Sequence, residues 1–166
     1  MSVTTRPARR EDAGDLRGIL NGIVAAGGTT AHQTPFTTER VLSQYIVRDR
    51  GLVCTVVEVD GKCAGFQSLA WPDEDGQAFP DGWAIIATFV SPAAAGRGAG
   101  RALFAATTDA ARAAGVRVID ATIRADNSGG LAFYERMGFV DYDVLPAVPL
   151  RDGTRVDRVR KRFDLA

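Results

Sequence analysis

Apolar residues recur along the chain with two spacings, one typical of helices and one typical of strands. A short strand is predicted over residues 2–7. Apolar positions at helical spacing then predict a helix that Asp12 caps and that the glycine pair at 27–28 ends. A threonine at 37 or 38 opens a second predicted helix. The first quarter of the chain is therefore expected to form one strand and two helices.

The next strand-like runs flank Asp60-Gly61, a dipeptide typical of two-residue hairpin turns. In the register that this turn sets, Cys54 faces Gln67. The sulfurs of Cys54 and Cys63 then lie roughly 13 Å apart at about 3.3 Å per residue, too far for a disulfide. Two cysteines and one histidine also fall short of a zinc ligand set. We expect both cysteines to be buried small hydrophobes and expect no metal site.

The second half of the chain begins with a run over 83–90 that is apolar on both faces, which predicts a fully buried strand. A glycine-rich turn, an alanine-rich helix over 99–114, a buried strand over 116–123 and a short helix over 127–137 follow. The remaining strand-like runs are 52–59, 63–70, 139–145 and 155–163, and a turn-rich loop covers 71–82. The order β-α-α-β-β-β-α-β-α-β-β predicts one domain over 1–166, of mixed α/β class, with a central sheet covered by helices.

The composition narrows the class of protein. The 166 residues carry 20 Lys+Arg and 20 Asp+Glu, so the formal charge is zero and the overall basic field that favours nucleic-acid binding is absent. No apolar run approaches the roughly 18 to 20 residues of a membrane span. The first residues also lack the apolar segment of a signal peptide. We expect a cytoplasmic protein with neither a membrane nor a nucleic acid as partner.

The glycines at 96, 98 and 100 lie directly between a predicted strand and a predicted helix. Free N–H groups and the positive dipole end of a helix form an anion site there, and glycines let phosphates approach the backbone. Arg101 stands where a dinucleotide fingerprint needs its third glycine, and the Gly-Lys-Ser/Thr of a P-loop is absent. Glycines that serve turn packing alone remain an alternative at this point.

Two segments together carry a resemblance. The run that begins Phe89-Val90 and continues through Ala95-Gly96-Arg97-Gly98-Ala99-Gly100 resembles the acetyl-CoA-binding motif of the GNAT superfamily of N-acyltransferases. Asn127 and the run Tyr134-Glu135-Arg136-Met137-Gly138-Phe139 are similar to the family's second signature, and the element order matches over the whole chain. The resemblance implies a GNAT-like fold. Its twisted sheet has about seven mostly antiparallel strands, and 83–90 and 116–123 splay to hold the cofactor.

The resemblance also implies direct acetyl transfer from acetyl-CoA to an amine. Ala95 stands where the family has Gln or Arg, so backbone donors and the guanidinium of Arg97 or Arg101 are expected to hold the pyrophosphate. Asn127 is expected to cap its helix and to touch the cofactor. The residues expected to bind acetyl-CoA are Phe89, Val90, Gly96, Arg97, Gly98, Ala99, Gly100, Arg101, Asn127 and Tyr134.

Three catalytic tasks need residues. Tyr134 resembles the family's general acid, and its neighbour Phe133 is expected to face away from the cleft. The Val90 amide is the candidate oxyanion donor. The strand 83–90 has no acidic residue to serve as the base that many relatives place there. Candidates for that base are Thr88 or backbone carbonyls holding a water, Asp81, and His32. The expected acceptor contacts are Thr30, His32 and Thr88.

Residues 21–40 are loosely similar to the amino-acid and phosphinothricin-type subgroup, so the expected acceptor is the primary amine of a small, amino-acid-like molecule. A protein or peptide N-acetyltransferase and a non-catalytic acyl-CoA-binding homodimer are the alternatives. Homodimers are common among relatives, so a homodimer is expected. The arginine-rich run 155–162 is interpreted as a solvated strand that protects a sheet edge. Contact with the cofactor's 3′-phosphate or with a dimer partner is the other interpretation of that run.

Overall fold

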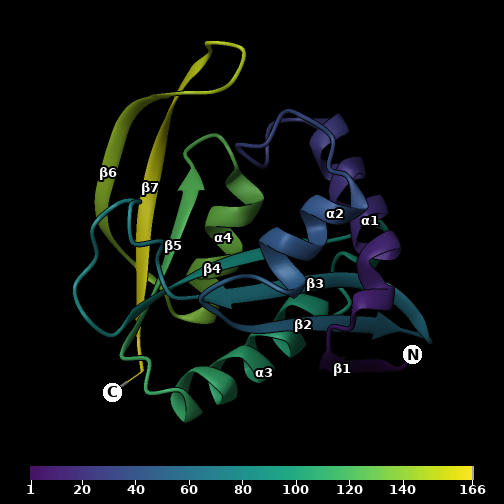
Figure 1. Cartoon of the computed structure of the whole chain (residues 1–166). Helices are drawn as coiled ribbons and strands as arrows, with labels where there is room; N and C mark the ends of the chain where they lie inside the picture. Colours follow the sequence, from purple (N-terminus) through teal and green to yellow (C-terminus); the bar gives the residue numbers. More distant parts are fainter. Residues whose placement is uncertain (166) are drawn as a thin grey trace.

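The protein is described by a computed structural model that covers residues 1–165 (Figure 1). One seven-stranded sheet has the strand order β1-β2-β3-β4-β5-β7-β6. The strands are β1 (Val3–Pro7), β2 (Gly51–Val59), β3 (Lys62–Ala70), β4 (Trp83–Val90), β5 (Val118–Arg124), β6 (Val140–Pro149) and β7 (Arg155–Asp164). The helices are α1 (Ala13–Ala26), α2 (Thr38–Val41, continued by a π-helical turn over Leu42–Ile46), α3 (Ala99–Ala113) and α4 (Ser128–Met137). The predicted element order and fold class are confirmed.

The two central strands diverge along their length. All neighbouring strands pair antiparallel except β4 and β5, which run parallel. That parallel pairing joins Trp83, Ala84 and Ile85 to Val118, Ile119 and Asp120 and goes no further. The later residues of both strands therefore have no partner across the gap. This is the splay that the resemblance predicts.

Helices pack on both faces of the sheet. On one face, α1 and α2 bury Leu16, Leu20 and Tyr45 against Phe66 and Phe89. On the other face, α3 and α4 form two further apolar clusters, which include Leu103, Phe104, Tyr134 and Phe139. Figure 1 shows α1 and α2 beside each other over β2 and β3, with α3 along the lower margin. The gap between β4 and β5 therefore lies between two helical layers.

The predicted hairpin forms, with one correction to its register. Asp60 and Gly61 both have positive φ, 51° and 80°, as a two-residue type I′ turn requires. Cys54 pairs with Ser68 and not with Gln67, because a bulge near Val57 adds one residue to β3. Cys54 is buried, as predicted, whereas Cys63 is half-buried. Burial raises the pKa of the Cys54 thiol to about 12, which disfavours the thiolate.

Two further sequence predictions are wrong. Asp12 begins α1 without capping it, because its carboxylate accepts bonds from the Arg9 N–H and the Arg6 guanidinium instead. The strand 83–90 is not fully buried. Trp83 and Ala84 are buried, but the residues from Ile85 to Thr88 are half-buried because the gap exposes this part of β4.

The arginine-rich run 155–162 does not protect an edge. Its strand, β7, lies inside the sheet between β5 and β6, and β6 forms the edge. Arg160 and Lys161 are buried as a result, and they pair with Asp143 and Asp141 of β6. The strand β7 therefore presents some of its basic side chains to the interior of the protein.

Candidate active site

The separation of β4 from β5 opens a cavity of about 830 Å³. This lies within the range of roughly 300–1,000 Å³ that is usual for small-molecule and cofactor sites. Its walls come from the ends of β4 and β5, the segment that follows α1, the glycine turn before α3, and α4. We refer to this cavity as the cleft.

The register of β4 decides which of its backbone groups face the cleft. Ser91 donates its N–H to the Ala64 carbonyl, and Gly65 lies opposite Val90. Because hydrogen-bonded and non-hydrogen-bonded pairs alternate in an antiparallel ladder, the backbone of Phe89 is directed toward β3. The backbone groups of Thr88 and Val90 are directed toward the gap. Of the two β4 residues expected to bind acetyl-CoA, Val90 directs its backbone groups toward the gap and Phe89 does not.

The glycine turn leads directly into the first turn of α3. Gly96 and Gly98 have φ of 77° and 79°, a left-handed conformation that favours glycine, and a Cβ at either position would meet no atom within 4 Å. The space above the turn is therefore open to a ligand. Gly98 is the N-cap of α3, so the N–H groups at the helix start are free to bind an anion. The residues of the turn line the cleft except Arg97, whose exposed side chain lies outside it.

Gly100 has a different role. A Cβ at this position would lie 2.5 Å from Cε1 of Phe133, so the glycine allows α4 to pack against the start of α3. Phe133 and Tyr134 both line the cleft, and the expectation that Phe133 faces away from it is wrong. Both side chains belong to one face of α4, since the lining residues Gly129, Gly130, Phe133, Tyr134 and Met137 recur at helical spacing.

Tyr134 is buried, and its hydroxyl lies 2.9 Å from Oγ1 of Thr88. Burial raises the pKa of this phenol to about 12, so the hydroxyl stays protonated at neutral pH. Asn127 caps α4 as predicted: its side-chain oxygen accepts the Gly130 N–H at 2.9 Å. Its amide nitrogen also donates to the Thr29 carbonyl, which ties α4 to the segment after α1.

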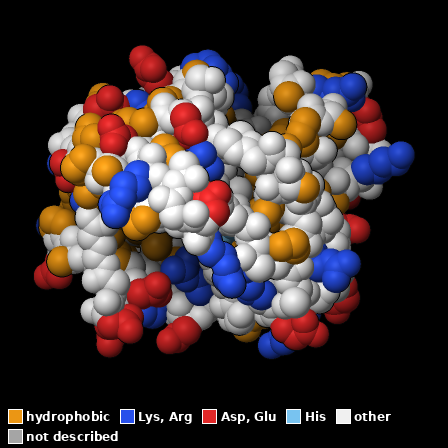
Figure 2. Space-filling model, turned by 90° about the horizontal axis from the view of Figure 1, so that it is seen from above, with side chains coloured by type: hydrophobic (Ala, Val, Ile, Leu, Met, Phe, Trp, Pro, Cys, Tyr) orange, Lys and Arg blue, Asp and Glu red, His pale blue; other side chains and the backbone are white. Residues whose placement is uncertain are grey.

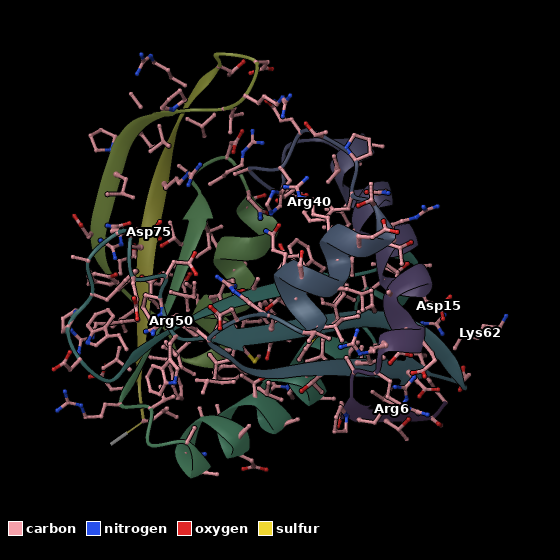
Figure 3. The ribbon with its side chains drawn as sticks, viewed as in Figure 1. Arg6, Asp15, Arg40, Arg50, Lys62 and Asp75 are labelled. Carbon is pink, nitrogen blue, oxygen red and sulfur yellow. The ribbon has the colours of Figure 1, made fainter. Side chains whose placement is uncertain are left out.

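That segment brings His32 into the cleft. Oγ1 of Thr30 accepts the His32 backbone N–H at 3.2 Å, and the imidazole Nε2 lies 3.2 Å from the Tyr45 hydroxyl. Burial is the main cause that lowers the pKa of His32 below its usual 6.5, and the nearby cations of Arg40 and Arg158 lower it further. His32 is therefore neutral at pH 7. Figure 3 shows Arg40 on α2, toward the centre of the molecule.

The cleft is lined by basic side chains. Arg101, Arg124, Arg136 and Arg158 contribute to its wall, and no Asp or Glu among residues 1–165 does so. Figure 2, which views the molecule from above, shows Lys and Arg side chains near the middle of this face. Asp81 lines a separate cavity under the 71–82 loop, so the structure does not support it as the base.

Several residues in the cleft or directly behind its wall were not identified from the sequence. Gln67 is fully buried in β3 and donates Nε2–H to Oγ1 of Thr88 at 2.9 Å. Arg124 donates to the Thr30 carbonyl at 2.9 Å, and Arg158 lines the cleft from β7. The pairing of Arg124 with Arg158 across β5 and β7 follows from a strand order that hydrophobic spacing does not reveal.

Within residues 1–165, no cluster of three or more His, Cys, Asp or Glu side chains is arranged to hold a metal ion. No helix in the same range has the length and apolar character needed to cross a membrane.

Known proteins share both the fold and the sequence pattern. An L-methionine sulfoximine/L-methionine sulfone acetyltransferase from Salmonella typhimurium is 27% identical over 157 residues, which are 93% of this chain and 90% of that protein. A Salmonella typhimurium acetyltransferase solved with acetyl-CoA superposes with a TM-score of 0.83 at 25% identity, over 100% of this chain and 95% of the other. A structure described as that of a phosphinothricin N-acetyltransferase superposes with a TM-score of 0.83 at 25% identity, over 99% of both chains.

The model of the acetyltransferase (GNAT) family matches residues 25–139. That range runs from the end of α1 to Phe139, two residues after the end of α4, so it includes the glycine turn, Thr88 and Tyr134. With more than half of its length matched, and with the splayed strands and glycine turn in place, this chain belongs to the GNAT family of acetyltransferases.

Proposed function

We propose that this protein transfers the acetyl group of acetyl-CoA to the primary amine of a small, amino-acid-like molecule. One observation carries the proposal: a single cleft joins the glycine turn at the start of α3 to Tyr134 and His32. The turn supplies donors for the phosphates, and the other two supply an acid and a base. The relatives that act on methionine sulfoximine and phosphinothricin support the class of acceptor.

The cofactor contacts follow from the chemistry of acetyl-CoA. Its diphosphate suits the free N–H groups from Gly98 to Arg101, and Arg101 adds a positive charge that Ala95 cannot provide. The amides of the pantetheine arm suit the unpaired N–H and carbonyl of Thr88 and the carbonyl of Val90, in the manner of an added strand. Asn127 and Phe133 complete the wall on the α4 side.

The transfer step forms one C–N bond and breaks one C–S bond. The amine nitrogen attacks the thioester carbonyl, and the Val90 N–H stabilises the negative charge that develops on the carbonyl oxygen. Tyr134 gives its proton to the leaving sulfur, which has an ordinary pKa near 8.5 as a free thiol. His32, the cleft's imidazole, takes a proton from the amine. Thr30 orients the segment that carries it.

A pH profile tests the role of His32. Because burial lowers the pKa of His32 below 6.5, kcat/KM is expected to stay high at neutral pH and to fall as the pH drops through that lowered pKa. His32→Gln should lose roughly 10- to 100-fold in kcat/KM at pH 7.5 and should also lose this acidic limb. With an acceptor amine of lower pKa, the part of the pH profile that reports the amine's own titration moves to lower pH. The acidic limb that reports His32 stays in place. An unchanged acidic limb in His32→Gln would exclude it as the base.

Arg158 is the expected partner of the acceptor's carboxylate. Its guanidinium lines the cleft near His32, and it makes no side-chain ion pair or hydrogen bond within residues 1–165. Arg158→Gln should raise KM for amino-acid acceptors roughly 10- to 100-fold, because a charged hydrogen bond is lost. KM for amines without a carboxylate should stay the same. The matched control is Arg155→Gln, an exposed arginine of β7 that does not line the cleft. Equal losses for both kinds of amine would contradict the assignment.

Thiol release from acetyl-CoA over a panel of amines tests the proposed function as a whole. Turnover with amino acids and their analogues is the expected result. Turnover confined to peptide acceptors would favour a protein N-acetyltransferase. Binding of acetyl-CoA without turnover of any amine would favour a non-catalytic acyl-CoA-binding protein. The homodimer, the cytoplasmic location and the single domain over 1–166 stay predictions.

A further inference from the structure

Three polar side chains from three elements form a chain of hydrogen bonds that ends at the cleft. Gln67 of β3 lies opposite Thr88 of β4, so their side chains stand on the same face of the sheet. Gln67 donates Nε2–H to Oγ1 of Thr88 at 2.9 Å, and Oγ1 of Thr88 lies 2.9 Å from the Tyr134 hydroxyl. Gln67 is fully buried, whereas Thr88 and Tyr134 line the cleft.

The contact between Thr88 and Tyr134 can form in two ways, because either hydroxyl can donate across it. A threonine oxygen has two lone pairs and carries one proton, and Gln67 occupies one of the lone pairs. When Thr88 donates its proton to Tyr134, the proton of Tyr134 itself is free to point into the cleft. This is the arrangement that a proton donor at Tyr134 requires.

Packing does not explain the presence of an amide at position 67. Leu69, which points to the same face of β3, is apolar and fully buried, and Oε1 of Gln67 has no hydrogen-bond partner among residues 1–165. A buried polar atom without a partner is destabilising, and a leucine of similar size would avoid that cost. The stability of the sheet therefore gives no reason for an amide at this position.

We propose that Gln67 and Thr88 are positioning residues that hold the Tyr134 hydroxyl with its proton directed at the leaving group. The inference rests on the proposed function, since it concerns the acid of that reaction. As the C–S bond breaks, the sulfur takes the proton of Tyr134. The oxygen of Tyr134 is left with a negative charge, which the Thr88 O–H stabilises, and water returns the proton after product release.

A double-mutant cycle tests this inference. Thr88→Val removes the hydroxyl and keeps the shape, and it should lower kcat about 10-fold with KM for acetyl-CoA unchanged. In a Tyr134→Phe background the same change should lower kcat less than about twofold, because the proton that Thr88 positions is gone. Thr88→Ser should restore most of the activity. Gln67→Leu should lower kcat less than Thr88→Val, because the hydroxyl remains but is no longer held.

The control is Thr107→Val on α3, a fully buried threonine outside the cleft whose hydroxyl has no hydrogen-bond partner among residues 1–165. It should leave kcat unchanged. If Thr88→Val costs the same factor with and without the Tyr134 hydroxyl, or changes KM alone, the inference is wrong. Wild-type turnover is measured first. Absence of turnover overturns the proposed function, whereas turnover with additive effects overturns only the positioning role.

Discussion

Replacing Tyr134 by phenylalanine is expected to lower kcat by roughly 100- to 1,000-fold, because the leaving thiolate loses its proton donor. The hydroxyl is buried, and its pKa of about 12 keeps it protonated over the working range of pH. The ring packs against Phe133 and Phe139, so the apolar contacts remain in the variant. The affinity for acetyl-CoA should change less than about twofold, since the lost interaction matters in the transition state.

The measurement is steady-state thiol release together with acetyl-CoA binding by calorimetry. Tyr142→Phe is the matched control. This tyrosine donates to Asp120 outside the cleft, so its loss should affect stability and leave kcat unchanged. A Tyr134→Phe protein that retains wild-type kcat would remove this phenol from the mechanism.

Replacing Gly98 by aspartate is expected to reduce the affinity for acetyl-CoA on the order of 100-fold. Gly98 is the N-cap of α3 in a left-handed conformation. Asp is a good N-cap residue and tolerates that conformation better than most side chains, so the helix should still form. Its carboxylate, however, would stand in the open space where the diphosphate is expected to bind.

Gly98→Asn separates charge from shape at the same position. Asparagine has to adopt the same left-handed backbone conformation as aspartate, but it carries no negative charge. The loss of affinity for acetyl-CoA in Gly98→Asn should therefore stay below about tenfold. Calorimetric titration with acetyl-CoA gives both values. Equal losses for the two variants would show that the turn does not hold an anion, and undiminished binding by Gly98→Asp would place the phosphates elsewhere.

Local sequence patterns predicted most of the fold. Asp60-Gly61 predicted the hairpin, and Asn127 with Gly138 marked both ends of α4, because turns and caps depend on a few adjacent residues. The predictions that were wrong depend on contacts between distant segments. The carboxylate of Asp12 pairs with Arg6, and the bulge in β3 shifts the pairing partner of Cys54 by one residue, from Gln67 to Ser68. Neither feature has a signal in the spacing of apolar positions.

The cleft residues that lie in the two motifs were predicted, as were Thr30 and His32, whereas Gln67 behind the cleft and Arg158 in its wall were missed. The glycine turn and Tyr134 lie in the two segments that resemble the family. Gln67 lies in an apolar strand where a single polar residue has no distinct pattern. Arg158 belongs to a basic run whose place inside the sheet depends on the order of β5, β7 and β6. Contacts between distant segments are therefore the part of the cleft that sequence reasoning describes least well.

A crystal structure of this protein with bound coenzyme A tests the central claim most directly. The claim predicts that the diphosphate accepts hydrogen bonds from the N–H groups between Gly98 and Arg101, with the sulfur beside the Tyr134 oxygen. A diphosphate bound away from the start of α3, or a sulfur out of reach of that phenol, would contradict it.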